Sequence, residues 1–266
     1  MASKELSRLN NLFLIPSHGS GRRLSTVKSF FFPPRNLRDE LLDLDEAPYE
    51  EVRESLQDVA TVNRYLSGYR VLLHHVEPFL KVHKADRPFT VLDAATGSAD
   101  QPIALVKLAR RLRVPIHITA IDINAKMLKL AREEIASFPE IRLVQCDILS
   151  LPFREVGFDL AVNSLSLHHF SWQKAVMILR AIYKAGRLGV VVNDLHRSRI
   201  AHAAIFLLTR IFTRNRLTRF DAPVSVMNAF TPEEFRQLAQ EAEMDPFEIH
   251  RHFPYRIALV GRKDGQ

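Results

Sequence analysis

The chain has 266 residues, of which 47% are hydrophobic, so it is long enough to bury a sizeable core. Its single cysteine, Cys146, excludes an internal disulfide and a cysteine-rich zinc site, and we expect no metal centre. The net charge of +7 is concentrated at 1–36 and 197–219, which leaves a mildly acidic remainder and argues against nucleic acid as a partner. No apolar run approaches the roughly 20 residues that cross a bilayer.

The N-terminal part of the chain divides into two segments. Residues 1–36 are basic and contain several serines, so we predict a flexible basic leader, with a targeting peptide as the alternative. Residues 37–86 are predicted to form a helical cap. Apolar residues recur at helical spacing over 49–66 and over 70–82, where Pro78 is a possible kink.

From Phe89 onward, strand-like and helix-like segments alternate, and we assign 87–266 to one α/β domain. Strands are expected at 89–94, 115–122, 141–146, 158–164, 188–194, 246–252 and 256–262, with helices at 99–112, 124–137, 171–185 and 231–243. This alternation predicts a doubly wound, mostly parallel seven-stranded sheet with helices on both faces. Residues 196–230 interrupt it as an insertion, in which 200–208 is an apolar helix.

The most informative motif joins the first strand to the next helix. Strand 89–94 ends at Asp93, a small-residue turn contains Gly97, and the second strand ends at Asp122. Dinucleotide sites carry G-x-G-x-x-G at this turn, so that the backbone can approach a pyrophosphate. Here Ala95, Gly97 and Asp100 occupy those places, and Asp100 would repel a pyrophosphate. Nicotinamide and flavin dinucleotides are therefore disfavoured.

S-adenosylmethionine fits the same residues better, because it has no phosphates and carries a sulfonium and an ammonium group. The Asp122 carboxylate can accept hydrogen bonds from both ribose hydroxyls. Asp147, after the third strand, suits the adenine amino group, and Gly97 lets the backbone come close to the methionine part. Arg64 is a candidate partner for the methionine carboxylate.

With these pieces in order, the chain resembles the class I S-adenosylmethionine-dependent methyltransferases, especially the small-molecule branch of ubiquinone and menaquinone C-methyltransferase-like proteins. The resemblance covers about 89–263 and rests on the motifs at 91–100, 120–124, 145–148 and 158–169. It implies a Rossmann-like fold with a helical lid at 196–230. The cofactor-binding residues that we predict are Asp93, Ala95, Gly97, Asp122, Ile123, Asp147, Ile148, Asn163, His168 and Arg64. The family usually has glycines where this chain has Ala95 and Ala99.

Catalytic candidates follow the fourth and fifth strands. Methyl transfer is an in-line displacement, so the protein positions the acceptor and, where needed, removes a proton. His169, His196 and Asp194 are our catalytic candidates, because histidine accepts a hydroxyl proton near neutral pH. For each histidine, packing or a backbone hydrogen bond is the alternative role.

We therefore predict a cytoplasmic methyltransferase that acts on a small hydrophobic acceptor, with O-methylation of a phenol-like or quinone-like compound favoured over C-methylation. A non-catalytic module that binds S-adenosylmethionine is the alternative. The arginines of 197–219 beside the apolar helix also suit peripheral contact with a membrane surface or an anionic group.

Overall fold

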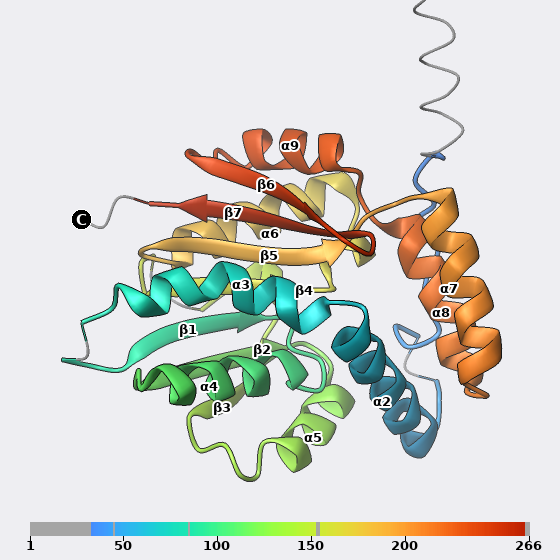
Figure 1. Cartoon of the computed structure of the whole chain (residues 1–266), viewed down its shortest axis with the longest axis horizontal. Helices are drawn as coiled ribbons and strands as arrows, with labels where there is room; N and C mark the ends of the chain where they lie inside the picture. The colour runs from blue at the N-terminus through green and yellow to red at the C-terminus, as the bar shows by residue number, and fades with distance from the viewer. Residues whose placement is uncertain (1–32, 45, 85, 153–154, 264–266) are drawn as a thin grey trace, which may run out of the picture.

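The computed structural model describes residues 33–44, 46–84, 86–152 and 155–263 (Figure 1). Most of the expected basic leader lies outside these residues. The strands are β1 (Phe89–Ala94), β2 (Ile116–Asp122), β3 (Ile141–Gln145), β4 (Leu160–Ser164), β5 (Gly189–Leu195), β6 (Phe247–His252) and β7 (Arg256–Arg262). The helices are α2 (Tyr49–Tyr65), α3 (Gly68–Lys81), α4 (Asp100–Leu112), α5 (Ala125–Glu134), α6 (Trp172–Ala185), α7 (Arg199–Phe212), α8 (Arg216–Asn228) and α9 (Pro232–Glu241), with short 3-10 turns η1 (Ile148–Ser150) and η2 (Leu167–His169).

The seven strands form one sheet in the order β3-β2-β1-β4-β5-β7-β6. The first five strands run parallel, and β7 lies antiparallel between β5 and β6. The strand order reverses between β1 and β4, so the loops after these two strands diverge and leave a crevice at their carboxyl ends. The predicted doubly wound sheet is therefore confirmed.

Apolar helix faces cover both sides of this sheet. On one face, Leu72 and Val76 of α3 and Leu105 of α4 pack against Val91 and Val191. The other face is covered by α6 and α9, whose buried side chains form a second cluster with β5 and β7. Strands buried on both faces read as continuous apolar runs, which is the pattern of residues 189–192.

The insertion differs from the prediction in one respect, because it contains two helices where the sequence indicated one. Asn215 caps α8 by accepting a hydrogen bond from the Thr218 N–H. Pro223 lies inside α8, and the helix buries polar as well as apolar residues, so its sequence carries a weak helical pattern. In Figure 1, α7 and α8 form a pair that stands apart from the sheet, beside α2.

The N-terminal segment 33–44 crosses the insertion without forming a helix. The Leu41 and Leu42 N–H groups donate to the two carboxylate oxygens of Asp221 on α8. Arg35 donates to the carbonyl oxygens of His168 and Phe170, after β4. These contacts hold the segment across the carboxyl end of the sheet.

Candidate active site

A cavity of about 850 Å³ opens at the carboxyl ends of β1, β2 and β4. Its floor is the turn after β1, and its sides come from α2, α7, α8 and the N-terminal segment 39–43. The tip of the β6–β7 hairpin, 253–256, completes the lining. This is the crevice in which open α/β sheets bind their ligands.

The turn after β1 adopts the left-handed conformation that glycine favours. Ala95, Gly97 and Ala99 have φ of 60°, 57° and 62°. The two alanines thus preserve the shape that glycines give in related turns, at a cost of roughly 1–2 kcal/mol each. A Cβ added to Gly97 would meet no atom within 4 Å, so the backbone there faces open cavity.

Two carboxylates border this turn. Asp122 accepts a hydrogen bond from the Gly97 N–H at 2.8 Å and from the Asn124 N–H at 2.9 Å, so both oxygens are fixed in place. Asp93 is buried, and among the described residues its Oδ2 has no hydrogen-bond partner. Burial raises the pKa of both groups, that of Asp93 to about 7.

A buried guanidinium lines the opposite side of the cavity. Arg256, at the start of β7, donates from Nη2 to Asn63 at 3.0 Å. Its Nη1 is buried without a partner among the described residues. Asn63 in turn donates to Asp100, which also accepts from the Tyr69 hydroxyl. Burial lowers the pKa of Arg256 to about 10, and Asp194 and Asp100 act in the opposite direction.

These groups fit S-adenosylmethionine. The unpaired Asp93 oxygen can attract its ammonium or sulfonium charge, and the free Nη1 of Arg256 can pair with its carboxylate. Asp122 stands at the end of β2, where its carboxylate can accept from a ribose diol. Gly97 provides the close backbone approach. When bound, this cofactor supplies an electrophilic methyl group.

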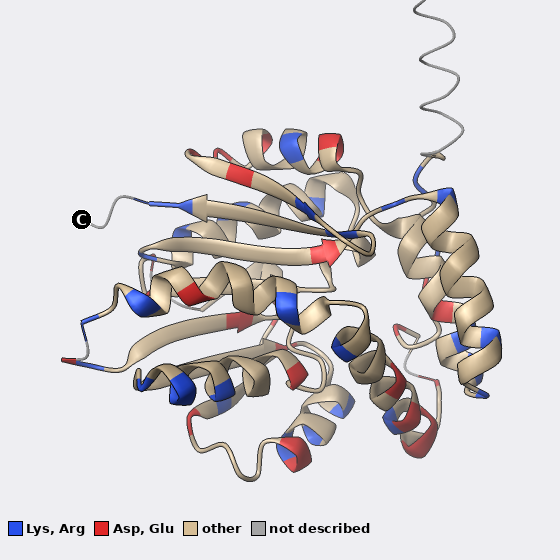
Figure 2. Cartoon of the chain, viewed as in Figure 1, with Lys and Arg blue, Asp and Glu red and all other residues tan. Residues whose placement is uncertain are grey.

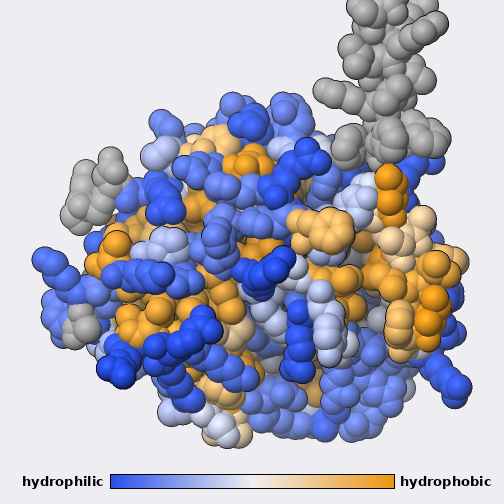
Figure 3. Space-filling model, viewed as in Figure 1, coloured by the Kyte–Doolittle hydropathy of each residue, from blue (hydrophilic) through white to orange (hydrophobic). Residues whose placement is uncertain are grey.

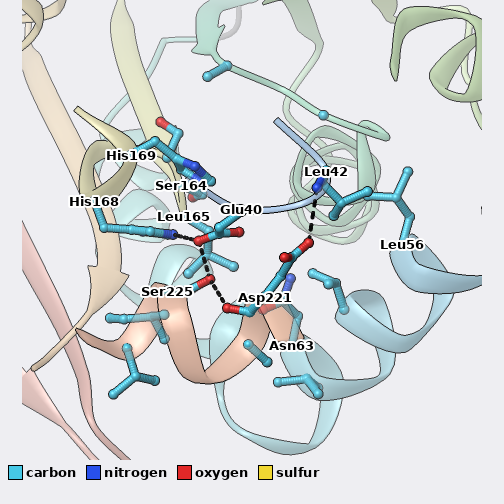
Figure 4. Close-up of a pocket in the computed structure, with 18 of the residues that line it drawn as sticks. Glu40, Leu42, Leu56, Asn63, Ser164, Leu165, His168, His169, Asp221 and Ser225 are labelled. Carbon is cyan, nitrogen blue, oxygen red and sulfur yellow. Dashed lines mark hydrogen bonds and ion pairs between the residues drawn. The ribbon is translucent and has the colours of Figure 1, made fainter. Parts of the chain in front are cut away.

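On the acceptor side, a buried imidazole lies between two carboxylates. Figure 4 shows one of them, Glu40, beside the His168 ring. The Nδ1 of His168 is 2.6 Å from Asp194 Oδ1, and its Nε2 is 3.6 Å from Glu40 Oε1. Burial alone would lower the pKa of His168, but the two acids raise it to about 10. Ser225 also donates to Glu40. His168 thus links β5 to the N-terminal segment, and the Ser225–Glu40 hydrogen bond extends this link to α8.

His169 has a different environment. It lines the cavity, it is partly exposed, and its Nδ1 lies 2.7 Å from Asp43 Oδ2. Burial raises the pKa of Asp43, but its hydrogen bond with His169 acts in the opposite direction, and the net effect is a lowered pKa. An imidazole held by a carboxylate in this way is oriented to accept a proton at its other nitrogen.

Glu40, His168 and His169 bring one ligand atom each within 4.8 Å of one another, which is the spacing of a candidate metal site. In the structure, Glu40 and Asp194 form ion pairs with His168 and raise its pKa, so a metal ion at this place would have to displace the proton that they hold. His169 pairs separately with Asp43.

The structure brings seven of the predicted site residues into the cavity lining. They are Asp93, Ala95, Gly97, Asp122, Ile123, His168 and His169. Asp194 lies directly behind His168. Their roles stay predictions, as do those of the residues placed elsewhere.

Besides Asp194, five predicted residues do not line this cavity: Asp147, Ile148, Asn163, His196 and Arg64. Asp147 caps η1 by accepting from the Leu149 N–H, and Asn163 donates to the Ala94 carbonyl across β1 and β4. His196 is buried, which lowers its pKa to about 4. Arg64 is exposed beside a neighbouring surface pocket, whereas Arg256, which we did not predict, reaches the site.

Comparison with known proteins is consistent with this geometry. Residues 91–189 match the family model described as a methyltransferase domain. The chain is 24% identical over 165 residues to a demethylmenaquinone methyltransferase of Porphyromonas gingivalis, covering 57% of this chain and 65% of that one. It is 29% identical over 154 residues to a 2-phytyl-1,4-naphtoquinone methyltransferase of Nostoc punctiforme, covering 55% and 65%. The chain thus spans a little under two thirds of the length of these relatives.

Solved structures share the fold over most of the chain. A methyltransferase dependent on S-adenosylmethionine (SAM) from Aquifex aeolicus superposes with a TM-score of 0.54 at 12% identity, covering 81% of this chain and 98% of that one. A putative S-adenosylmethionine-dependent methyltransferase from Methanococcus maripaludis gives 0.55 at 16% identity, covering 83% and 97%. Residues 91–189 are thus similar to a methyltransferase domain, and the fold over most of the chain is that of solved S-adenosylmethionine-dependent methyltransferases. Within that class, the chain is similar to quinone methyltransferases.

Proposed function

We propose that the chain methylates a small, hydrophobic, hydroxylated aromatic acceptor of the phenol or quinone type, with the hydroxyl oxygen as the nucleophile. The observation that carries this proposal is the pair formed by His169 and Asp43, which faces the same cavity as the cofactor turn. The names of the sequence relatives support the quinone class of acceptor.

In this mechanism the protein orients the acceptor and moves one proton. His169 accepts the hydroxyl proton at its nitrogen remote from Asp43, and Asp43 stabilises the imidazolium that forms. With its proton removed, the acceptor oxygen would be the nucleophile for the methyl group that S-adenosylmethionine would supply when bound, with a neutral thioether as the leaving group. His169 returns its proton to solvent.

The apolar part of the cavity suits a ring-containing acceptor. Leu56, Val59 and Val62 of α2 face Ala201 and Leu208 of α7 across the lining. Apolar walls of this kind exclude water from the reacting groups. A hydroxylated ring bound between them can present its oxygen to His169.

Product analysis with methyl-labelled S-adenosylmethionine tests the proposal on a panel of hydroxynaphthoquinones and phenols. We expect a methoxy product, and His169→Gln should lower kcat by about 10²–10⁴ with cofactor affinity unchanged. His117→Gln is the matched control, because His117 is exposed on β2 and lies outside the cavity lining. A product methylated on ring carbon would contradict the oxygen assignment, and cofactor binding without turnover on any acceptor would favour a non-catalytic module.

A further inference from the structure

We propose that α7 docks this protein onto an anionic lipid surface, beside the mouth of the cavity. The docking face consists of Ile200, Leu207 and Ile211 on one stripe of α7, together with Phe212 at the end of the helix, and is here called the α7 patch. Their exposed fractions are 52%, 59%, 63% and 78%, which is high for large apolar side chains. This inference goes beyond the proposed function and does not depend on it.

The first observation is that α7 is apolar on two adjoining stripes. Ala201, Ala204, Ile205 and Leu208 line the cavity and follow the i, i+3, i+4, i+7 spacing of one helix face. At 100° per residue, Ile200, Leu207 and Ile211 fall on the neighbouring stripe, which faces solvent. The apolar surface of α7 is therefore wider than the stripe that lines the cavity. An exposed apolar stripe of this kind marks a surface that contacts another apolar layer.

The second observation is the charge around the patch. Residues 197–219 contain six arginines and no acid (Figure 2). Two of them are paired: Arg197 is buried and pairs with Glu234, and Arg216 pairs with Glu51. In the part of the chain that the structure describes, no carboxylate forms an ion pair with Arg210, Arg214 or Arg219. An apolar stripe flanked by uncompensated arginines is complementary to an anionic headgroup layer, because the stems bury while the guanidinium groups contact phosphate.

The third observation is the position of the cavity mouth. Phe253, at the tip of the β6–β7 hairpin, is 83% exposed and lines the same cavity as α7. Figure 3 shows apolar surface on this side of the molecule, over α7. A lipid layer in contact with the α7 patch would therefore lie next to an opening with apolar walls, and a lipophilic acceptor could enter without crossing water.

No helix of the described residues is long and apolar enough to cross a membrane. The docking that we propose is therefore peripheral, with one helix lying along the surface. The affinity of the protein for the lipid surface should depend on both the apolar stripe and the arginines. Salt should weaken the contribution of the arginines, because it screens their charges.

Sedimentation of the full chain with lipid vesicles tests this proposal without any substrate. We expect at least tenfold stronger partitioning onto phosphatidylcholine vesicles that contain phosphatidylglycerol than onto phosphatidylcholine alone. Leu207→Asn should lower the partition coefficient about tenfold. Arg214→Gln should lower it about fivefold, and only on the anionic vesicles.

Matched controls separate docking from unfolding. Met177→Asn removes a similarly exposed apolar side chain from α6, and Arg142→Gln removes an exposed charge from β3, and both should leave partitioning unchanged. Equal, weak pelleting with both vesicle types would overturn the proposal. So would a concentration-dependent dimer in sedimentation velocity that Leu207→Asn abolishes, because the α7 patch would then be a self-association surface. Loss of methyl transfer with vesicle binding intact would count against the proposed function alone.

Discussion

Replacing Asp93 by asparagine is expected to stabilise the protein while weakening its cofactor binding. The Asp93 side chain is 1% exposed, and its Oδ2 is unpaired among the described residues. Burial raises its pKa to about 7, and Asp100 and Asp122 act in the same direction. In the unfolded chain the same group ionises near its ordinary pKa of 3.8.

This difference of about three pKa units corresponds to roughly 4 kcal/mol, at about 1.4 kcal/mol per unit. Between these two pKa values the folded chain holds a proton that the unfolded chain has lost. The free energy of unfolding therefore falls as pH rises from about 4 to 7, and the penalty is complete above pH ~7.5. Asparagine does not ionise, so Asp93→Asn should gain roughly 2–4 kcal/mol at pH 8, or about 5–10 °C in Tm.

Thermal unfolding of the cofactor-free protein at pH 5 and pH 8 measures this effect. The gain should shrink by more than half at pH 5. Asp159→Asn is the matched control, because Asp159 is equally buried but is paired with Arg87 and Arg187, which hold its pKa well below its usual range. Asp159→Asn should lower the free energy of unfolding by about 3–5 kcal/mol. A gain for Asp93→Asn that is absent, or equal at both pH values, would refute the reasoning.

The same substitution should weaken S-adenosylmethionine binding at least tenfold at pH 8, because an ionised carboxylate attracts the cationic cofactor. Calorimetric titration of the wild type should show affinity rising from pH 5 to pH 8 as Asp93 ionises. The Asp93→Asn variant should lose that dependence. A wild-type affinity that is independent of pH would place the cofactor's charges away from Asp93.

Three further predictions concern the cofactor side of the cavity. Asp122→Ala should weaken cofactor binding about 10–100-fold in calorimetry, because hydrogen bonds to charged groups contribute about 1.5–3 kcal/mol; undiminished affinity would contradict a ribose contact. Arg256→Gln should weaken S-adenosylmethionine at least tenfold but leave adenosine, which lacks the carboxylate, unchanged in a competition assay; equal losses for both would indicate a structural role. Ala95→Gly should raise Tm by a few degrees. Relief of the left-handed strain stabilises the folded chain more than the added entropy of glycine stabilises the unfolded chain, and the difference is about 0.5–1 kcal/mol. A lower Tm would show that packing of the alanine methyl group contributes more than this difference.

The sheet and most helices could be predicted because their signals are local. An apolar run such as 89–92, bounded by turn residues, indicates a buried strand wherever it lies. Helix α8 lacked such a signal, because it carries Pro223 and buries Thr218, Asp221 and Asn228 together with apolar residues. Those polar groups form hydrogen bonds with segments that are distant in the sequence. The periodicity of apolar residues within a helix gives no information about such contacts.

The cofactor turn was predictable for the same reason, since Asp93, Gly97 and Asp122 follow successive strands of a parallel sheet. The residues that the sequence did not indicate act across large separations. Asp43 and His169 are 126 positions apart, and Arg256 and Asn63 are 193 apart. One feature of the sequence could have indicated Arg256. It is a charged residue at the start of an otherwise apolar strand, and it lies at the carboxyl edge of the sheet.

The matched domain supplies part of the cavity, and segments outside it supply the rest. The matched domain, 91–189, contains the cofactor turn and His169. Asp43, which orients His169, comes from the N-terminal segment, and the apolar walls come from α2 and α7. All of these lie outside the matched domain, as does Arg256 on the cofactor side, so in the function that we propose the acceptor side of the cavity is built mainly by segments outside the family match. Acceptor preference is therefore expected to respond to substitutions in 39–43 and α7 more than to any within the turn.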